Sequence, residues 1–262
     1  MAVYPLGAGI SKVPLPQRMV DCGAFVQHTA LPVLSWLRII EADFFARWAM
    51  RRDDMRMQTP GEEVANAFIH AAGLILVVMT VVVWPLPRTA SSRVPMPATA
   101  VYLSTMALLY ATSTVYHGLP PGRAKRLCMK LDYWTIYLFI AGSYTPFALG
   151  VLSGHGGSAL LLVIWSLAAT GIALQAFGKL AHPLLSTGFY LAMGWAVLAV
   201  ARPLFALLPA AGLAWLLAGA VCYTGGVAFF LMDSRLKFAH SIWHLCVLVG
   251  SACHFVAIAW YA

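Results

Sequence analysis

Charged residues are scarce in this sequence, and their scarcity excludes most soluble folds. Only 10% of the 262 residues are charged, whereas 61% are hydrophobic. A soluble domain usually has about 25% charged residues, because its surface faces water. The mean hydropathy of +0.80 agrees with this shortage. We therefore predict that membrane lipids are the main solvent of the chain.

Acidic residues are the scarcer charge type, with 9 Asp and Glu against 17 Lys and Arg. In a soluble protein the net charge of +8 would suggest a nucleic-acid partner. Here the basic residues lie in short loops beside apolar runs, the pattern that sets the orientation of a membrane protein. We therefore expect no nucleic-acid partner.

We expect neither a disulfide framework nor a secretory leader. The N-terminus has no continuous apolar core of a signal peptide, because Pro5, Pro14 and Pro16 interrupt it. The five cysteines have no CxxC spacing and mostly lie within or beside apolar segments, which favours small core residues: Cys22, Cys128, Cys222, Cys246 and Cys253.

Residues 1–58 differ in composition from the rest of the chain. Their apolar run, residues 31–50, is interrupted by four charged residues: Arg38, Glu41, Asp43 and Arg47. Each charge at the centre of a spanning helix costs about 2.5–3.5 kcal/mol, so this run is not predicted to cross the membrane. We expect residues 1–58 to form a cytoplasmic arm with an amphipathic helix on the membrane surface or against the bundle. Residues 59–262 then form the transmembrane domain.

Apolar segments of spanning length follow the arm, since about 20 residues cross the hydrocarbon core. They lie at residues 66–85, 97–117, 131–150, 158–177, 184–206, 211–231 and 240–261. The linkers between them are rich in Pro, Gly and charge. The sequence therefore predicts an all-α integral membrane bundle of seven transmembrane helices.

Basic residues predict the orientation of this bundle. With the N-terminus inside, the arm and the inner loops hold 14 Lys and Arg residues, and the outer segments hold 3. Short loops rich in Lys and Arg stay in the cytoplasm. We therefore predict a cytoplasmic N-terminus and, because the number of spans is odd, an outside C-terminus.

Polar residues recur near the cytoplasmic ends of three predicted helices. Ser113 and His117 are four residues apart in the second helix, and His240 and His244 have the same spacing at the start of the seventh. Residues four apart share one helix face. Asp132, near the start of the third helix, is the one acid that the predicted bounds place within an otherwise apolar helix. The topology brings all five to one depth, where ionisable residues mark functional sites.

Three of these residues have the chemistry of metal ligands. His117, His240 and His244 offer three nitrogens to a tetrahedral zinc ion and leave a fourth position for water. Zinc lowers the pKa of its water to about 7 and polarises a carbonyl, which predicts a hydrolytic site. Asp132 would orient a ligand or accept a proton, and Ser113 would hydrogen-bond the water or an oxyanion. Iron and manganese also accept imidazole ligands.

Simpler interpretations of the same residues stay open. A His at a helix end is often a polar group at the membrane interface, and a pair of His residues four apart also arises by chance. Asp132 has an alternative role as the cap of the third helix or as a partner of Lys130 or Arg126. The Ser113 hydroxyl could instead only donate a hydrogen bond to a backbone carbonyl of its own helix.

At these residues the sequence resembles the hemolysin III branch of the progestin and adipoQ receptor family. The similarity extends from about residue 59 to the end of the chain. Ser241 and Ile69 stand where the bacterial branch often has Glu and Thr. The resemblance rests on an ordered set of segments: Gly61-Glu62-Glu63-Val64-Ala65-Asn66 with His70, Ser113-Thr114-Val115-Tyr116-His117, Leu131-Asp132, Ala141-Gly142-Ser143-Tyr144-Thr145-Pro146-Phe147, His240-Ser241-Ile242-Trp243-His244, Gly250-Ser251 and His254-Phe255.

The resemblance implies a seven-helix protein of the bacterial inner membrane with zinc held at His117, His240 and His244, and with Ser113 and Asp132 beside it. The adiponectin receptors of the family look like ceramidase-type hydrolases, which implies a lipid amide or ester as substrate. The name of the branch reflects cytolysis, which keeps open a pore-forming or membrane-perturbing protein, although no helix has a repeated polar stripe to line a pore. A sensor of membrane lipids with structural zinc is a further alternative.

Four further polar residues belong to the same motifs. Glu63, Asn66 and His70 are three or four residues apart near the start of the first helix. Interhelical hydrogen bonds are a sufficient reason for them, and direct chemistry is the alternative. His254 is ten residues beyond His244, about 15 Å along the helix axis, so it cannot bind the same metal. We predict that His254 makes a buried polar contact, with a substrate or proton role as the alternative.

Overall fold

The computed structural model describes residues 56–83, 94–180 and 182–262, and within these residues every regular element is a helix. The predicted arm lies outside the described residues, except for its last three positions. The helices are α2 (Pro60–Val83), α3 (Met96–Gly118), α4 (Arg123–Leu149), α5 (Gly157–Ala176), α6 (Pro183–Trp195), the short 3₁₀ helix η1 (Ala196–Val200), α7 (Ala201–Leu207), α8 (Ala210–Leu231) and α9 (Ala239–Tyr261).

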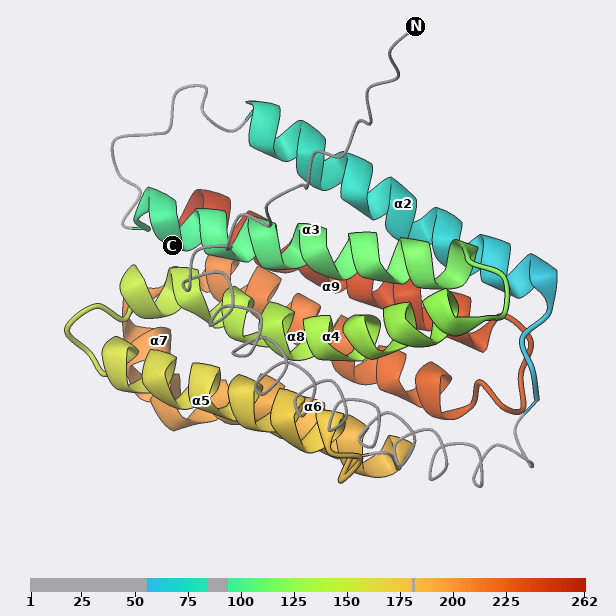
Figure 1. The fold of residues 1–262 in the computed structure, drawn as a ribbon. Coiled ribbons are helices and arrows are strands. Elements are labelled where there is room, and N and C mark those ends of the chain that lie inside the picture. The colour runs from blue at the N-terminus through green and yellow to red at the C-terminus, as the bar shows by residue number, and fades with distance from the viewer. Residues whose placement is uncertain (1–55, 84–93, 181) are drawn as a thin grey trace, which may run out of the picture.

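The long helices lie side by side in one bundle (Figure 1). α2 packs against α3 and α9, α4 packs against α3 and α5, and α8 packs against α9. α6 contacts α4, α5 and α8 and completes the bundle on the side opposite α2. The start of α2, the end of α3 and the starts of α4 and α9 meet at one end of the bundle (Figure 1).

Most of these helices present apolar faces that suit lipid. Six stretches of the described chain are long and apolar enough to cross a membrane, namely α2, α3, α5, residues 183–207, α8 and α9. Large apolar side chains on their outer faces are well exposed, such as Phe68 at 73% and Leu162 at 71%. A soluble monomer rarely exposes so much contiguous apolar surface. The prediction of an all-α membrane bundle is confirmed at this level.

α4 begins at Arg123, well before the predicted span of residues 131–150. Lys, Arg, Leu and Met are good helix formers, and nothing after Gly122 breaks the helix, so the basic segment continues into the apolar one. Asp132 therefore lies in the third turn of α4, and its alternative role as the cap of this helix does not hold. α4 is less apolar than its neighbours because it packs among other helices, where it buries Tyr137 and Tyr144.

α2 also begins earlier than its predicted span of residues 66–85. Pro60 suits the first helical position, because its missing N–H would have no partner there. Thr59 and Glu62 form a capping box: Glu62 Oε2 accepts from the Thr59 backbone N–H at 2.9 Å, and Thr59 Oγ1 accepts from the Glu62 N–H at 3.4 Å. Glu62 and Glu63 are thus helical, so the expectation that Asp132 is the one acid within a helix was wrong.

The predicted span 184–206 is one crossing made of three pieces, α6, η1 and α7. Pro203 cannot donate a backbone hydrogen bond, which interrupts the regular helix. The hydroxyl of Tyr144, from α4, donates a hydrogen bond to the Met193 carbonyl at 2.8 Å. The same hydroxyl oxygen accepts a hydrogen bond from the Val197 N–H at 3.0 Å. A neighbouring helix therefore satisfies backbone groups that lipid could not.

Candidate metal centre

Three histidine side chains meet where α3 ends and α9 begins. His117 comes from the last turn of α3, and His240 and His244 come from the first two turns of α9. Each offers a ligand atom within 4.8 Å of the other two. The Nε2 atoms of His117 and His244 are 3.1 Å apart. Two ligands about 2.0–2.1 Å from a tetrahedral zinc ion are about 3.3 Å apart, so the spacing of His117 and His244 suits such an ion and the group of three could hold a metal.

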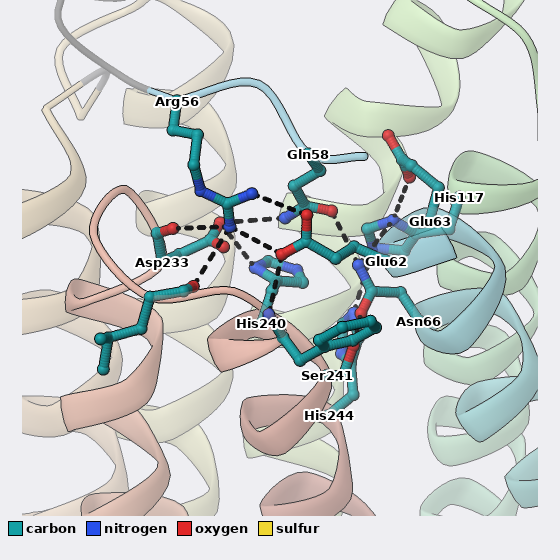
Figure 2. A network of polar contacts seen from close by, with 12 residues as sticks. Arg56, Gln58, Glu62, Glu63, Asn66, His117, Asp233, His240, Ser241 and His244 are labelled. Atoms are coloured by element: carbon teal, nitrogen blue, oxygen red, sulfur yellow. Dashed lines mark hydrogen bonds and ion pairs between the residues drawn. The ribbon is translucent and has the colours of Figure 1, made fainter. Parts of the chain in front are cut away.

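Two of these histidines have a carboxylate behind the ring. His117 Nδ1 lies 2.7 Å from Glu63 Oε2, and His240 Nδ1 lies 3.3 Å from Asp233 Oδ2 (Figure 2). A carboxylate in this position fixes the tautomer of a metal-binding His and leaves Nε2 free for the ion. His244 Nδ1 has no hydrogen-bond partner among the described residues. Glu63 thus orients His117 through a hydrogen bond, whereas Asp233 places a carboxylate near His240 Nδ1, which makes no hydrogen bond within the described residues.

α2 and the segment before it surround the cluster with further hydrogen bonds. The buried Asn66 accepts from Ser241 Oγ at 2.5 Å and donates to Gln58 Oε1 at 2.7 Å. Lys125, from α4, pairs with Glu63 at 3.0 Å. Glu63 and Asn66 therefore make the interhelical hydrogen bonds that their spacing led us to expect, and Glu63 also contacts a candidate ligand.

A buried acid joins the segment before α2 to the loop between α8 and α9. Glu62 is 1% exposed, and its two oxygens accept hydrogen bonds from Arg56 at 2.6 and 2.7 Å (Figure 2). Arg56 also donates to the backbone carbonyls of Asp233 and Leu236. Glu62 accepts from the Phe238 N–H at 2.7 Å. Phe238 has a φ of 58°, a conformation that is costly for a non-glycine residue, so this network holds the start of α9 in place.

Two charged groups of this network lie outside the membrane-spanning helices. Hydrogen bonds to Glu62 raise the pKa of Arg56 above its ordinary value. Burial acts to raise the pKa of Asp233, but the contacts with His240, Gln58 and Arg56 outweigh it and hold that pKa below its ordinary value. Asp233 is therefore ionised at neutral pH and supplies a negative charge behind the His240 ring.

Asp132, Ser113 and His70 lie next to the histidine cluster. The carboxyl of Asp132 lies near His240 and the Ser113 hydroxyl, and Ser113 Oγ makes no hydrogen bond within the described residues. Ser113 is fully buried and makes no hydrogen bond to its own helix within the described chain. The His70 ring, from α2, lies with its centroid 4.0 Å from that of His244. The structure thus brings together the residues that the predicted topology placed at one depth, and it adds His70.

A cavity of about 170 Å³ opens beside the cluster. Its polar end is lined by His70, Asp132, His240 and His244. The lining residues of α9 share one helix stripe that extends from His240 to His254, about 21 Å at 1.5 Å per residue. Between these ends the wall is mainly apolar and aromatic, as in ligand pockets with a few convergent polar groups: Leu109, Ile136, Phe139, Ile140, Leu191, Trp195, Val227, Trp243 and Val247.

His254 lies at the far end of this cavity and makes a polar contact of the kind predicted. Its Nε2 is 3.3 Å from the Leu216 carbonyl of α8. Its ring packs edge-on against Tyr223, with the centroids 5.2 Å apart. These contacts with Leu216 and Tyr223 hold His254 away from the three candidate metal ligands, as the expected separation of His254 from His244 along α9 requires.

Sequence reasoning missed Arg56, Gln58 and Asp233. All three lie in segments that the sequence assigned to the N-terminal arm or to a linker. The hydrogen bonds of Arg56 and Gln58 with Asp233 join positions more than 170 residues apart. The spacing of Thr59 and Glu62 is a capping-box signal that would have moved the start of α2. No local signal predicts the loop contacts, because they depend on how α2 packs against α9.

The fold and the cluster define a multi-pass helical membrane protein with a candidate metal centre at one end of its bundle. Residues 58–255 match the family described as Haemolysin-III related, and the chain belongs to this family. The resemblance to the hemolysin III branch is thereby confirmed. No solved structure matches the chain.

Bacterial and human relatives agree with this assignment. The chain is 37% identical over 206 residues to Hemolysin-3 homolog of Bacillus subtilis (strain 168), covering 78% of this chain and 96% of that protein. It is 40% identical over 204 residues to Hemolysin-3 of Bacillus cereus, covering 76% and 91%. It is 32% identical over 207 residues to Monocyte to macrophage differentiation factor of Homo sapiens, covering 75% and 83%. The apolar helices and the bacterial relatives support an integral protein of the bacterial plasma membrane.

Proposed function

We propose that this protein is a zinc-dependent hydrolase that acts on a lipid amide or ester. One observation carries the proposal: three histidines that could share one metal ion lie at the polar end of a long, mainly apolar cavity, and Asp132 lines the same end of that cavity. A metal site with a purely structural role has no need of an adjoining cavity. Three nitrogen ligands with one open position are typical of catalytic zinc.

The proposed chemistry divides between the ion and the protein. Zinc at this site would act as a Lewis acid on the substrate carbonyl and on water. Asp132 accepts the proton of the water that adds to the carbonyl carbon and passes it to the leaving amine or alkoxide. The Ser113 hydroxyl holds the Asp132 carboxyl in place or donates to the oxyanion. Glu63 keeps the His117 ring oriented, and Asp233 places a carboxylate near the His240 ring.

The cavity favours a lipid over a water-soluble substrate. Aliphatic and aromatic side chains line it beyond the polar end, so burial of an alkyl chain there is favourable. We infer that the chain of the substrate lies in this cavity with its carbonyl at the histidines. A ceramide-like amide is the substrate class that we favour, with other lipid amides and esters as members of the same class.

The proposal includes a seven-span topology with the metal centre in the cytoplasmic half of the membrane. α4 would be the seventh span, because its neighbours α3 and α5 are apolar enough to cross and it runs between them. The basic residues in the first turns of α4 and in the loop before α9 support an inside N-terminus. Residues 1–58 would form a cytoplasmic arm, and residues 59–262 the transmembrane domain.

Substitution of Asp132 tests the proposed mechanism. Asp132→Asn keeps the shape of the side chain but removes the proton acceptor, so turnover of a fluorescent ceramide analogue should fall by about 10²–10⁴-fold. Zinc content should stay at the wild-type level, because Asp132 is not a proposed ligand. Normal turnover by this variant would show that Asp132 is not the base.

A membrane-perturbing protein with structural zinc is the second candidate function. It is favoured by the names of the Bacillus relatives, Hemolysin-3 and its homolog, and by the position of the cluster, which joins α3 to α9. Vesicles loaded with dye separate the two candidates. A hydrolase cleaves its lipid without dye release, whereas a membrane-perturbing protein releases dye from vesicles that contain no cleavable lipid.

A further inference from the structure

A second group of polar side chains lies deeper in the bundle than the histidine cluster, and the centroid of its Tyr110 ring lies 5.0 Å from that of His70. Ser251 is 1% exposed, and its Oγ accepts hydrogen bonds from Tyr110 Oη at 2.8 Å and from Tyr223 Oη at 3.2 Å. The same Oγ donates to the Val247 carbonyl. The Ser251 hydroxyl is therefore fully used. The Tyr223 hydroxyl donates its single proton to the hydrogen bond with Ser251, so the Tyr223 oxygen can act towards a ligand only as an acceptor.

His254 adds a second acceptor at this end of the cavity. The Leu216 carbonyl can only accept, so the His254 Nε2 beside it must hold a proton. A charged imidazole is costly inside the membrane, so the ring is taken as neutral and Nδ1 as unprotonated. Nδ1 has no hydrogen-bond partner among the described residues. A buried acceptor of this kind costs free energy unless a donor reaches it.

The fold makes specific room for this ring. A Cβ at Gly219 of α8 would overlap the Cδ2 and Nε2 atoms of His254, so only glycine allows the ring to reach the Leu216 carbonyl. The edge of the ring that carries Nε2 therefore faces α8, and Nδ1 lies on the other side of the ring. His254 and Tyr223 both line the cavity that begins at the metal centre.

We propose that the His254–Tyr223 end of the cavity binds a hydroxyl group on the alkyl chain of a lipid. This assignment rests on the proposed function, which places the carbonyl of the same lipid at the histidine end. Both groups offer acceptors and neither offers a free donor, so the bound group must be a hydrogen-bond donor. The wall between the two ends is mainly apolar and aromatic, so it favours a ligand with an alkyl segment between its carbonyl and its hydroxyl. His254 lies about 15 Å along α9 from His244, which sets the length of that segment.

A hydroxyl site at this end narrows the substrate class from lipids in general to lipids with a hydroxylated acyl chain. An unsubstituted chain fits the same apolar walls but leaves the His254 acceptor without a donor. A site built to bind a hydroxyl discriminates against the analogue that lacks it, because the buried polar group is then left unpaired. A water molecule at Nδ1 is the competing occupant, and it would give the hydroxylated chain no advantage.

A pair of matched lipids tests the assignment on the full-length protein in detergent. A ricinoleoyl amide and an oleoyl amide differ only in one hydroxyl, which lies well along the chain of the former. Trp195 and Trp243 line the cavity, so intrinsic tryptophan fluorescence reports entry of either chain. We expect the ricinoleoyl amide to bind about fivefold to tenfold more tightly, from one additional hydrogen bond to a buried acceptor.

His254→Gln separates recognition from a structural role. A glutamine amide reaches the Leu216 carbonyl from the Nε2 position but places nothing at Nδ1. The variant should therefore fold, and it should bind the ricinoleoyl amide no more tightly than the oleoyl amide. Equal affinity of the wild type for both lipids, no binding of either, or a preference retained in His254→Gln would each overturn the assignment. If the variant does not fold, the comparison of the two lipids on the wild type still decides.

Hydrolysis of the same two amides distinguishes this assignment from the proposed function. Cleavage of both amides at equal affinity would contradict the hydroxyl site and leave the hydrolase intact. A binding preference for the ricinoleoyl amide without any cleavage would support the hydroxyl site and contradict the hydrolase.

Discussion

Glu63 has a role at the metal centre that its charge alone would not suggest. Its Oε2 lies 2.7 Å from the buried Nδ1 of His117, and its Oε1 pairs with Lys125 at 3.0 Å. The lysine pairs with one oxygen of the carboxylate, and the other oxygen fixes which nitrogen of His117 faces the other histidines. Glu63 thus acts through His117 and not on the substrate.

Glu63→Gln is therefore expected to weaken zinc binding by about 10- to 100-fold, the usual cost of removing a carboxylate behind a metal-binding His. Competition with a chelator of known zinc affinity measures this directly on the purified protein. Lys125→Gln is the matched control, because it removes the partner of Glu63 and leaves the contact with His117. Its effect should be several times smaller, and an equal or larger effect would mean that local charge matters more than ring orientation.

The residues of the site divide into those that the sequence predicts and those that only packing determines. His117, His240 and His244 follow from spacing and topology, because the ends of antiparallel helices meet at known depths. The contact between Glu63 and His117 does not follow, since it depends on how α2 is rotated about its own axis against α3. The same holds for Asp233, whose position is set by a loop that Arg56 and Glu62 hold.

At the scale of single helices, composition predicted where the chain crosses but not where each helix begins. α4 and α2 both extend into polar segments, because good helix formers continue the hydrogen-bond pattern past the edge of the apolar run. The irregular α6–η1–α7 segment depends on Tyr144, which belongs to another helix. The sequence of the α6–η1–α7 segment alone does not predict its contact with Tyr144.

The close approach of α3 and α4 depends on Gly142. A Cβ there would overlap the side chain of Thr105, whose hydroxyl is held by the carbonyls of its own helix and cannot swing away freely. Gly142→Ala should therefore lower the free energy of unfolding by about 1–3 kcal/mol, as overpacking usually does. Denaturant-induced unfolding in detergent micelles measures the change.

Gly188→Ala is the control for this helix contact. Gly188 lies within α6, and apart from its own helix backbone no atom of the described residues lies within 4 Å of the place where its Cβ would be. Alanine is a better helix former there, so the variant should be as stable as the wild type or more stable by about 0.5–1 kcal/mol. A similar loss of stability in both variants would contradict the packing explanation for Gly142.

For the whole molecule, the proposed orientation places the turn between α4 and α5 outside and the loop between α8 and α9 inside. Single cysteines at Ser153 and Arg235, in a background without the natural cysteines, report on these two positions. A membrane-impermeant maleimide added to intact cells should label Ser153→Cys and should label Arg235→Cys only after the membrane is opened. The reverse pattern would place the metal centre on the outer side.

The central claim is that His117, His240 and His244 together hold a metal ion, and the most direct measurement is the metal content of the detergent-purified protein by mass spectrometry. The account predicts about one zinc ion per chain, and none in a His240→Ala, His244→Ala double variant that keeps its helical content. No metal in the wild-type protein, purified without chelators, would contradict the account. The three imidazoles would then be polar groups that hydrogen-bond to one another between α3 and α9.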